Sequence, residues 1–390
     1  MTLHDAHSTV DDLAFRSLAD ELMAAIRHWE EQGEWWSDAA FNEFAHSAFE
    51  LQYDEIVAYR RYCDRRGATP AGVTQWTEIP PVPVTAFRHV PLIVGDEAAA
   101  QLVFLTSGTT AGPTSRGRHL VREPALYRAS MEAAFRRLVP GGEGPRRFAS
   151  LVPPFPESSG SSLAWMIDGL MACYGDSESR HLASESGLEW DAAAGFMDEA
   201  VADRVPTCIL ATTTALDAWI RLLRNQDRRW QLPAGSIVMD TGGAKGRHEL
   251  KRADVCAGVR ESLGVESSHM VNEFGMTELL SQLYSVPSAS GVDAFDEPGG
   301  EASWLRGPPW LRVRALDPND LSPLPDDEPG LLCYFDLANL GSVSAVLTED
   351  IGRVRGRAVQ WLRRTLGSPP RGCSLATAEL LAAQESPANG

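Results

Sequence analysis

The stretch "TCILATTTALDAWIRLL", residues 207–223, combines a short apolar run with a helical pattern that follows it at once. The same order occurs twice more. "RRFASLVPP", residues 146–154, precedes a helical pattern over residues 162–173, and residues 235–251 contain an apolar run, a glycine turn and a helical pattern. Repeated strand-then-helix order is typical of a mostly parallel sheet flanked by helices. The sequence therefore predicts an α/β core.

The segments on either side of this core have different patterns. Before it, apolar residues recur with a helical period over residues 11–33 and 38–66. The run "IPPVPVTAF", residues 79–87, holds three prolines in four positions, which argues against a helix and predicts an extended connector. After about residue 287, short strands alternate with turns rich in Pro, Gly and Asp. We therefore expect three parts: a helical N-terminal region with the connector (1–100), an α/β core (101–285), and a small β-rich C-terminal subdomain with a terminal helix (286–390).

The composition limits the partners of the chain, which has 390 residues and a formal net charge of −18 at pH 7. A charge of this sign argues against nucleic acid or an anionic membrane as the main partner, because both would repel it. The N-terminus has acidic residues where a secretory signal has basic ones, and the most apolar helical stretch, residues 161–174, is interrupted by Asp168 and too short to cross a bilayer. The six cysteines lack paired spacing, which suits reduced thiols. The sequence predicts a cytoplasmic protein without a membrane span.

A run rich in hydroxyls and glycines, "TSGTTAGPTSRGR", follows the strand-like residues 101–105. Glycines let the backbone approach an anion closely, and hydroxyl groups add donors. The Gly-x4-Gly-Lys-Ser/Thr pattern of a Walker A loop is absent, and the alternative is a flexible surface loop. The next positive charge is Arg116, and no lysine occurs before Lys245. We expect the run to bind nucleotide phosphates through these residues: Thr106, Ser107, Gly108, Thr109 and Thr110.

Three later stretches could also carry chemistry. A glycine turn at residues 241–245 follows an apolar run, and a plain strand-to-helix turn is its alternative interpretation. "VNEFGMTELLSQLY", residues 271–284, places Glu278 just after a Phe-Gly turn, where a carboxylate near phosphates could hold Mg²⁺. The alternative is that residues 275–277 begin a helix whose dipole favours an acidic residue. Asp350 ends a further strand pattern, where an isolated aspartate is usually a cap.

Taken in order, these stretches resemble the motifs of the adenylate-forming superfamily, which activates carboxylates with ATP. The order is the Thr/Ser/Gly loop, Gly-Gly-Ala, Phe-Gly-Met-Thr-Glu and Thr-x-Asp-x-Gly. Four further features are similar to the narrower acyl-protein synthetase (LuxE-type) family: "PPVPVTAF", a loop ending in "TSR", "TGGAK" and the late "RGCS". The resemblance covers about residues 70–380. It implies a large domain of parallel sheets flanked by helices, with a small β-rich C-terminal subdomain.

The resemblance implies a role for each matching position. The loop would hold the ATP phosphates, with Arg116 near the place of the superfamily's loop lysine. Thr277 and Glu278 would serve phosphate and magnesium, and Asp350 would hold the ribose hydroxyls. The nucleotide and acyl pocket would be lined by two sets of residues: Gly242, Gly243 and Ala244, and Phe274, Gly275 and Met276.

The sequence departs from the superfamily pattern near its end. Members continue into a mobile C-terminal domain that delivers a catalytic lysine, whereas here 390 − 350 = 40 residues follow Asp350 and none is a lysine. We therefore expect the fold to lack that full domain. The catalytic positive charge would come from Arg116, Lys245 or Arg118, or from later arginines such as Arg353 and Arg371.

Cys373, in "RGCS", is a candidate nucleophile. A reactive thiol needs its pKa lowered from about 8.5 by a cation or a helix N-terminus. Arg371 precedes Cys373 and a helical pattern follows it. The resemblance to the late cysteine of acyl-protein synthetases implies that Cys373 could take the acyl group as a thioester. The alternatives are a small buried residue at the start of a helix, and acyl transfer straight to CoA or a carrier protein.

The resulting hypothesis is an ATP- and Mg²⁺-dependent ligase. It would convert a carboxylic acid into an acyl-adenylate and transfer the acyl group to Cys373, to CoA or to a carrier protein. The acid is expected to be fatty or aryl, with Trp165 and Met166 as a wall of its pocket or as ordinary core residues. The other partner would be a reductase. The alternative function is a catalytically impaired nucleotide-binding partner subunit of a reductase or biosynthetic complex.

Overall fold

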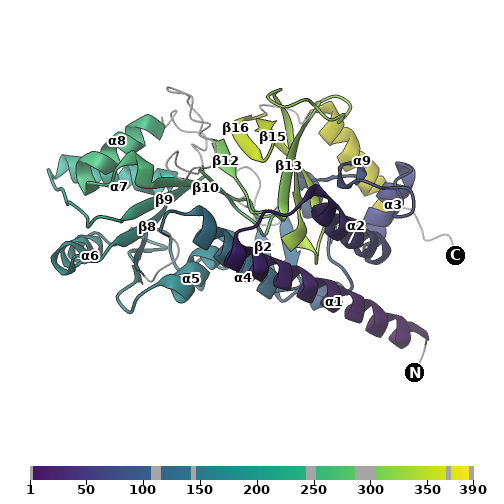
Figure 1. Cartoon of the computed structure of the whole chain (residues 1–390), viewed down its shortest axis with the longest axis horizontal. Coiled ribbons are helices and arrows are strands. Elements are labelled where there is room, and N and C mark those ends of the chain that lie inside the picture. The colour runs from purple at the N-terminus through teal and green to yellow at the C-terminus, as the bar shows by residue number, and fades with distance from the viewer. Residues whose placement is uncertain are drawn as a thin grey trace. The chain divides into compact units, whose positions relative to one another are not determined.

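The computed structural model describes residues 3–106, 116–141, 146–242, 252–285, 304–365 and 370–385, and its elements are shown in Figure 1. The chain forms two compact units. The first contains Met1–Ala133, Met276–Ser281 and Gly307–Gly390, and the second contains Ala134–Gly275 and Gln282–Arg306. The division into three parts at residues 100 and 285 stays a prediction.

The second unit is built on a sheet whose central strands are parallel. Its strand order is β12-β11-β10-β9-β8-β4-β5. Strands β5, β4, β8, β9 and β10 run parallel, β11 pairs antiparallel with β10, and β12 pairs antiparallel with β11. This arrangement confirms the α/β fold predicted from the strand-then-helix order. The strand bounds are β4 (Arg147–Ser150), β5 (Arg180–His181), β8 (Thr207–Thr212), β9 (Ile237–Thr241), β10 (Met270–Phe274), β11 (Leu283–Ser285) and β12 (Trp304–Arg306).

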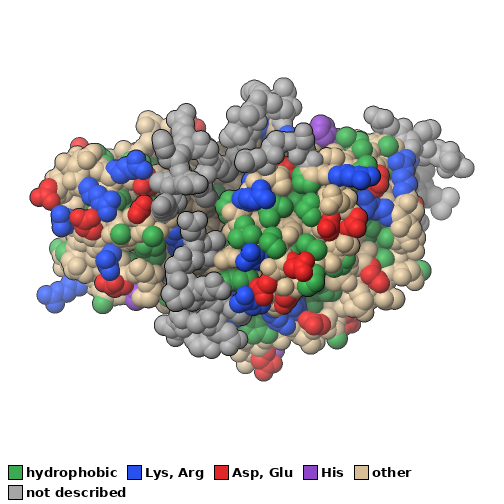
Figure 2. Space-filling model, turned by 90° about the horizontal axis from the view of Figure 1, so that it is seen from above, with side chains coloured by type: hydrophobic (Ala, Val, Ile, Leu, Met, Phe, Trp, Pro, Cys, Tyr) green, Lys and Arg blue, Asp and Glu red, His purple; other side chains and the backbone are tan. Residues whose placement is uncertain are grey.

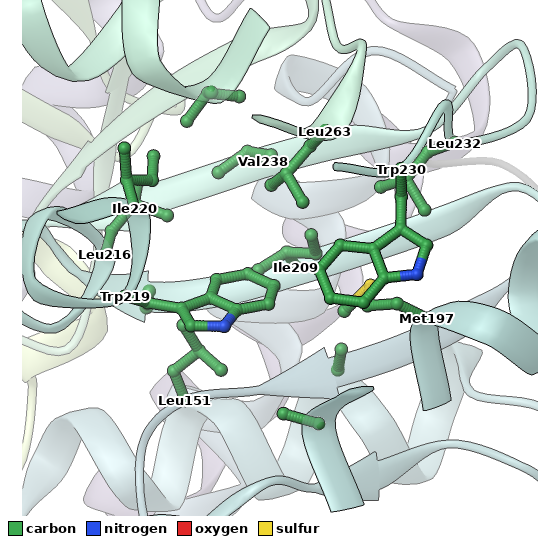
Figure 3. Packing of buried hydrophobic residues seen from close by; sticks show 14 of the residues in the cluster. Leu151, Met197, Ile209, Leu216, Trp219, Ile220, Trp230, Leu232, Val238 and Leu263 are labelled. Atoms are coloured by element: carbon green, nitrogen blue, oxygen red, sulfur yellow. The ribbon is translucent and has the colours of Figure 1, made fainter. Parts of the chain in front are cut away.

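Helix α7 (Thr213–Asn225) shows how sequence and packing agree in this unit. The Thr212 hydroxyl caps the helix by accepting from the amide of Ala215, and the apolar side chains recur at the spacing of one helix face. Figure 3 shows side chains of this face together with Ile209 and Trp230 in one apolar cluster. The buried residues of this α7 face are Leu216, Trp219, Ile220 and Leu223. The other helices of the unit are α5 (Ser162–Tyr174), α6 (Trp190–Asp203) and α8 (Arg252–Leu263), and a small hairpin joins β6 (Ala183–Ser184) to β7 (Gly187–Leu188).

The first unit begins with helices α1 (Leu3–Gln32), α2 (Asp38–Glu55) and α3 (Val57–Arg65). The helical pattern over residues 38–66 is therefore divided, because Ile56 leaves the helical conformation (φ −100°, ψ 91°) and is buried.

The proline-rich connector is extended only in part. Val82 and Pro83 form β1, which pairs with β15 in parallel, but Val84–Arg88 forms the short 3-10 helix η2. A proline restricts itself and the residue before it, so the residues after Pro83 are free to turn.

The C-terminal strands form an antiparallel meander in the order β13-β14-β15-β16, which confirms the predicted β-rich part. A separate hairpin joins β2 to β3. Arg61 and Arg65 of α3 donate hydrogen bonds to carbonyls in the last turn of α9. The bounds are β2 (Leu102–Leu105), β3 (Arg118–Val121), α4 (Pro124–Leu138), β13 (Leu311–Leu316), β14 (Gly330–Asp336), β15 (Ala345–Arg355), β16 (Ala358–Arg364) and α9 (Arg371–Glu385); α4 crosses from the first unit into the second.

On one face of the molecule the acidic side chains of the described residues do not gather in a single patch (Figure 2). On the face shown in Figure 2, hydrophobic, acidic and basic side chains are intermixed over the described residues. Among these residues, no helix has both the length and the apolar character that crossing a bilayer requires.

Candidate functional site

The carboxyl ends of β8, β9 and β10 lie together at one edge of the sheet in the second unit. Thr241 is in register with Thr212 on one side and with Glu273 on the other. The strand ends of an open α/β sheet are where such folds bind ligands. Among the predicted site residues, Gly242 directly follows β9, Phe274 is the last residue of β10, and Gly275 follows it. The structure therefore brings all three to this edge.

Asp240 is the centre of a buried hydrogen-bond network beneath this edge. Its carboxylate accepts from the Thr213 hydroxyl (2.8 Å), from Arg252 Nη1 (2.8 Å) and from Asn272 Nδ2 (3.1 Å). The Thr213 oxygen also lies 2.7 Å from the carbonyl oxygen of Gly242. The network therefore fixes the turn after β9. Gly242 has φ +83°, a conformation that favours glycine, although a Cβ there would meet no atom within 4 Å.

Glu273 is a second buried carboxylate at the same edge. Burial raises its pKa to about 7, Asp240 adds to the rise, and a hydrogen bond from the Thr241 hydroxyl opposes it. A Cβ on Gly275 would lie 2.7 Å from Glu273 Oε1. A side chain at position 275 would therefore have to displace the carboxyl group of Glu273.

In the first unit, the structure describes both ends of the Thr/Ser/Gly loop. The Thr106 amide donates to the Gly117 carbonyl (2.9 Å), and the Gly117 amide donates to the Thr106 hydroxyl (2.8 Å). Arg116 Nε donates to the Thr106 carbonyl (2.6 Å) and its Nη2 to the carbonyl of Leu105 (3.3 Å). Arg116 thus binds main-chain carbonyls at the base of the loop. Arg118 forms an exposed ion pair with Glu97.

Seven predicted site residues lie outside the described residues, so their proposed roles rest on the sequence alone. They are Ser107, Gly108, Thr109, Thr110, Gly243, Ala244 and Lys245.

Glu278 and Asp350, both predicted site residues, lie near each other in the first unit. Burial raises the pKa of Glu278 to about 7, Asp350 adds to the rise, and the positive charges of Arg364 and Arg88 oppose it. Asp350 is in register with Arg364 across β15 and β16, and its amide donates to the Thr348 hydroxyl (3.1 Å). Residues 275–282 contain no helix, so the interpretation of Glu278 as a helix N-terminal residue is wrong.

Sequence reasoning missed Arg88 and Arg364. Arg88 ends η2, and its Cγ lies 3.5 Å from the position of a Cβ on Gly117, beside the root of the loop. Arg364 is the last residue of β16. No motif marks either arginine, because each meets Glu278 only through the folding of distant segments.

The residues around Glu278 fit a magnesium ion held mainly by substrate. Within the ranges that the structure describes, no three His, Cys, Asp or Glu side chains form a closed metal cage. Mg²⁺ usually takes one or two carboxylates and completes its octahedron with water and phosphate oxygens. Glu278 is a single carboxylate that could fill such a position.

Cys373 departs from its predicted chemistry. Helix α9 does begin at Arg371, but the Cys373 residue is 0% exposed and packs with Cys333, Leu347 and Ile351. Burial raises the pKa of its thiol to about 11, and Glu349 adds to the rise. The expected lowering of the pKa is therefore wrong for this structure, because desolvation of the thiolate outweighs the helix N-terminus and the nearby arginine.

We expect Cys373 to resist alkylation in the native protein. At pH 8 iodoacetamide should modify it at least ~100-fold more slowly than the exposed Cys173, because the thiolate is the reactive form. Timed alkylation followed by mass spectrometry of the two peptides measures the ratio. Equal rates in the folded protein would contradict the burial described above.

Comparison with known proteins gives relatives over different parts of the chain. The acyl-protein synthetase (LuxE) family matches residues 201–382. A long-chain-fatty-acid–luciferin-component ligase of Vibrio harveyi is 22% identical over 396 residues, which cover 98% of this chain and 97% of the relative. The ligase of the same name from Aliivibrio fischeri is 36% identical over 83 residues, or 19% of this chain and 22% of the relative.

Solved structures show the same fold. The open conformation of 2-hydroxyisobutyryl-CoA ligase, in complex with 2-HIB-AMP and CoA, matches with a TM-score of 0.61 at 12% identity. The match covers 84% of this chain and 69% of that chain. The chain is therefore an enzyme of the ligase class, related to the acyl-protein synthetases of the LuxE type and built on the fold of the adenylate-forming ligases.

Proposed function

We propose that this protein activates a carboxylic acid with ATP and then passes the acyl group to a thiol. A carboxylate oxygen of the acid attacks the α-phosphorus of ATP, the bond between that phosphorus and the bridging oxygen breaks, and pyrophosphate leaves with the electron pair. The observation that carries this proposal is the buried Glu278, beside Asp350 and facing the charges of Arg88 and Arg364.

Each residue of the Glu278 cluster has a proposed role that follows from the chemistry of its side chain. Asp350 accepts hydrogen bonds from the ribose hydroxyls, as carboxylates do for neutral donors. Arg88 and Arg364 offer positive charge to the phosphate oxygens, and Arg116 keeps the root of the loop in place. Glu278 holds Mg²⁺, which when bound neutralises the charge that develops on the phosphates. This chemistry consists mostly of positioning and charge neutralisation.

The acyl acceptor is a thiol whose sulfur attacks the carbonyl carbon of the adenylate while AMP leaves. Three acceptors are candidates: Cys373, CoA and a carrier protein. Attack by Cys373 requires the start of α9 to move, because its thiol is fully buried. The names of the two bacterial relatives favour a long-chain fatty acid as the substrate.

Pyrophosphate release with a panel of acids tests the proposal. We expect release that depends on ATP, on Mg²⁺ and on one class of apolar acid, with fatty acids of different lengths compared with aryl acids. The rival function is a nucleotide-binding partner subunit without catalysis. Nucleotide binding without pyrophosphate release for every acid of the panel would favour that rival.

A further inference from the structure

The segment that carries Glu278, residues 277–281, is held by buried side chains from distant parts of the first unit. His119 Nδ1 lies 2.7 Å from the carbonyl oxygen of Thr277. Asn339 Nδ2 donates to the carbonyl oxygen of Glu278 at 2.9 Å. His119 and Asn339 are both fully buried. Two successive carbonyls are therefore fixed at the residue that carries the carboxylate.

Asp336 binds the other end of the same segment. Its carboxylate accepts from the amide of Leu280 (2.8 Å) and from the hydroxyl of Ser281 (2.6 Å). It also accepts from the amide of Ala338, the second residue of the short helix η7 (Leu337–Asn339). Asp336 is the last residue of β14 and Asn339 is the last residue of η7. Two neighbouring positions therefore bind the segment that carries Glu278.

The protonation of His119 makes it a fixed donor. Burial lowers the pKa of the imidazole to about 4, so the ring is neutral at pH 7. A carbonyl oxygen can only accept, so Nδ1 must carry the proton in this contact. The ring also packs edge-on against Phe87 at 5.7 Å between centroids. His119 is therefore oriented by packing, and its ring stays neutral near pH 7 with its one proton on Nδ1.

We propose that His119 and Asn339 are positioning residues that set the direction of the Glu278 side chain toward magnesium and phosphate. The inference rests on the proposed function. Fixing the carbonyls of Thr277 and Glu278 fixes the peptide planes on both sides of the Glu278 Cα, and thereby the direction in which its side chain leaves the backbone. Displacement of a catalytic group by about 1 Å can cost 10²-fold in rate.

Three substitutions and one control test this role. His119→Leu removes the donor to Thr277, and His119→Asn restores an amide donor near the place of Nδ1. Asn339→Ser shortens the side chain that reaches Glu278. Tyr59→Phe is the matched control, because it loses one buried hydrogen bond to a carbonyl, that of Pro80 at 2.9 Å, elsewhere in the same unit.

The measurement is ATP binding by titration calorimetry, once with Mg²⁺ and once with EDTA, beside thermal melting. We expect His119→Leu and Asn339→Ser to weaken binding with Mg²⁺ about tenfold and to leave binding in EDTA unchanged. His119→Asn should recover most of the loss, and Tyr59→Phe should lower only the melting temperature. Should His119→Leu fail to fold, Asn339→Ser decides the question.

Two results would overturn the inference. If the variants keep the Mg²⁺-dependent part of binding seen in the wild type, the hydrogen bonds only support the fold. If the wild type itself binds ATP equally in Mg²⁺ and in EDTA, Glu278 has no metal to present and the positioning role falls with it. Pyrophosphate release by the wild type is scored separately, so acid activation can stand when the positioning role does not.

Discussion

Replacing Glu278 by glutamine is expected to lower the rate of pyrophosphate release at least ~100-fold, which corresponds to about 2.7 kcal/mol of transition-state stabilisation. The amide keeps the shape of the side chain but loses the charge that a hard cation requires. Glu266→Gln, at an exposed position, is the control and should leave the rate unchanged. Near-normal release by Glu278→Gln would remove Glu278 from the metal site.

The same substitution is expected to stabilise the fold at alkaline pH. The folded state holds the pKa of Glu278 at about 7, above its ordinary value of 4.5. Between these pH values the folded state binds more protons than the unfolded state. The contribution of Glu278 to the free energy of unfolding is therefore fully present below about pH 4.5 and is lost as the pH rises through 7. Glutamine does not titrate, so the variant should gain up to roughly 3 kcal/mol on the wild type between pH 4 and pH 8. Urea unfolding at both pH values measures the gain.

The second large effect is expected for Asp240→Ala, which should lower the unfolding free energy of the second unit by about 3 kcal/mol. Asp240 is fully buried, and its loss removes the acceptor that Arg252, Thr213 and Asn272 share. Thr213 keeps the carbonyl of Gly242 and Asn272 keeps the main-chain carbonyl of position 240, so Arg252 loses most. Each buried donor left unsatisfied costs about 1–3 kcal/mol, which relaxation of the partly exposed Arg252 reduces.

Hydrogen exchange followed by mass spectrometry of β8, β9 and β10 provides the measurement. Asp217→Ala is the matched control, because it removes a carboxylate from a pair with Arg221 (2.8 Å) that lies four residues away on the same helix. Such pairs contribute about 0.3–0.5 kcal/mol. Equal protection of the three strands in both variants would show that the Asp240 network does not stabilise this edge.

Local patterns were sufficient to predict the architecture of the second unit. In residues 207–223 an apolar run precedes a helix face with apolar spacing, and both features are properties of neighbouring residues. The family resemblance implied that Gly242 and Gly275 line one pocket, and the structure places both at one sheet edge because parallel strands end together. The nearness of Glu278 and Asp350 was implied by the family resemblance alone, since no local pattern links positions so far apart.

The sequence could not indicate the groups that complete the Glu278 cluster. Arg88 and Arg364 belong to segments without a motif, and His119 and Asn339 reach residues 277–278 across more than 60 positions of sequence. The error at Cys373 has the same origin. Its neighbours in sequence are a cation and a helix start, but its pKa is set by apolar side chains from β13, β14 and β15.

Helix α9 has two unequal ends. Its end is hydrogen-bonded to two arginines of α3. Arg65 donates to the carbonyls of Glu379 and Ala382, and Arg61 donates to the carbonyl of Ala383. Its first turn, with Cys373, is held by apolar packing and by a hydrogen bond from the Gly372 amide to the Pro318 carbonyl (2.9 Å). Separating the start of the helix from the fold breaks the hydrogen bond to Pro318, whereas separating its end breaks the three that Arg61 and Arg65 donate. We therefore expect α9 to fray first at the end that carries the thiol, because fewer hydrogen bonds join that end to the rest of the first unit.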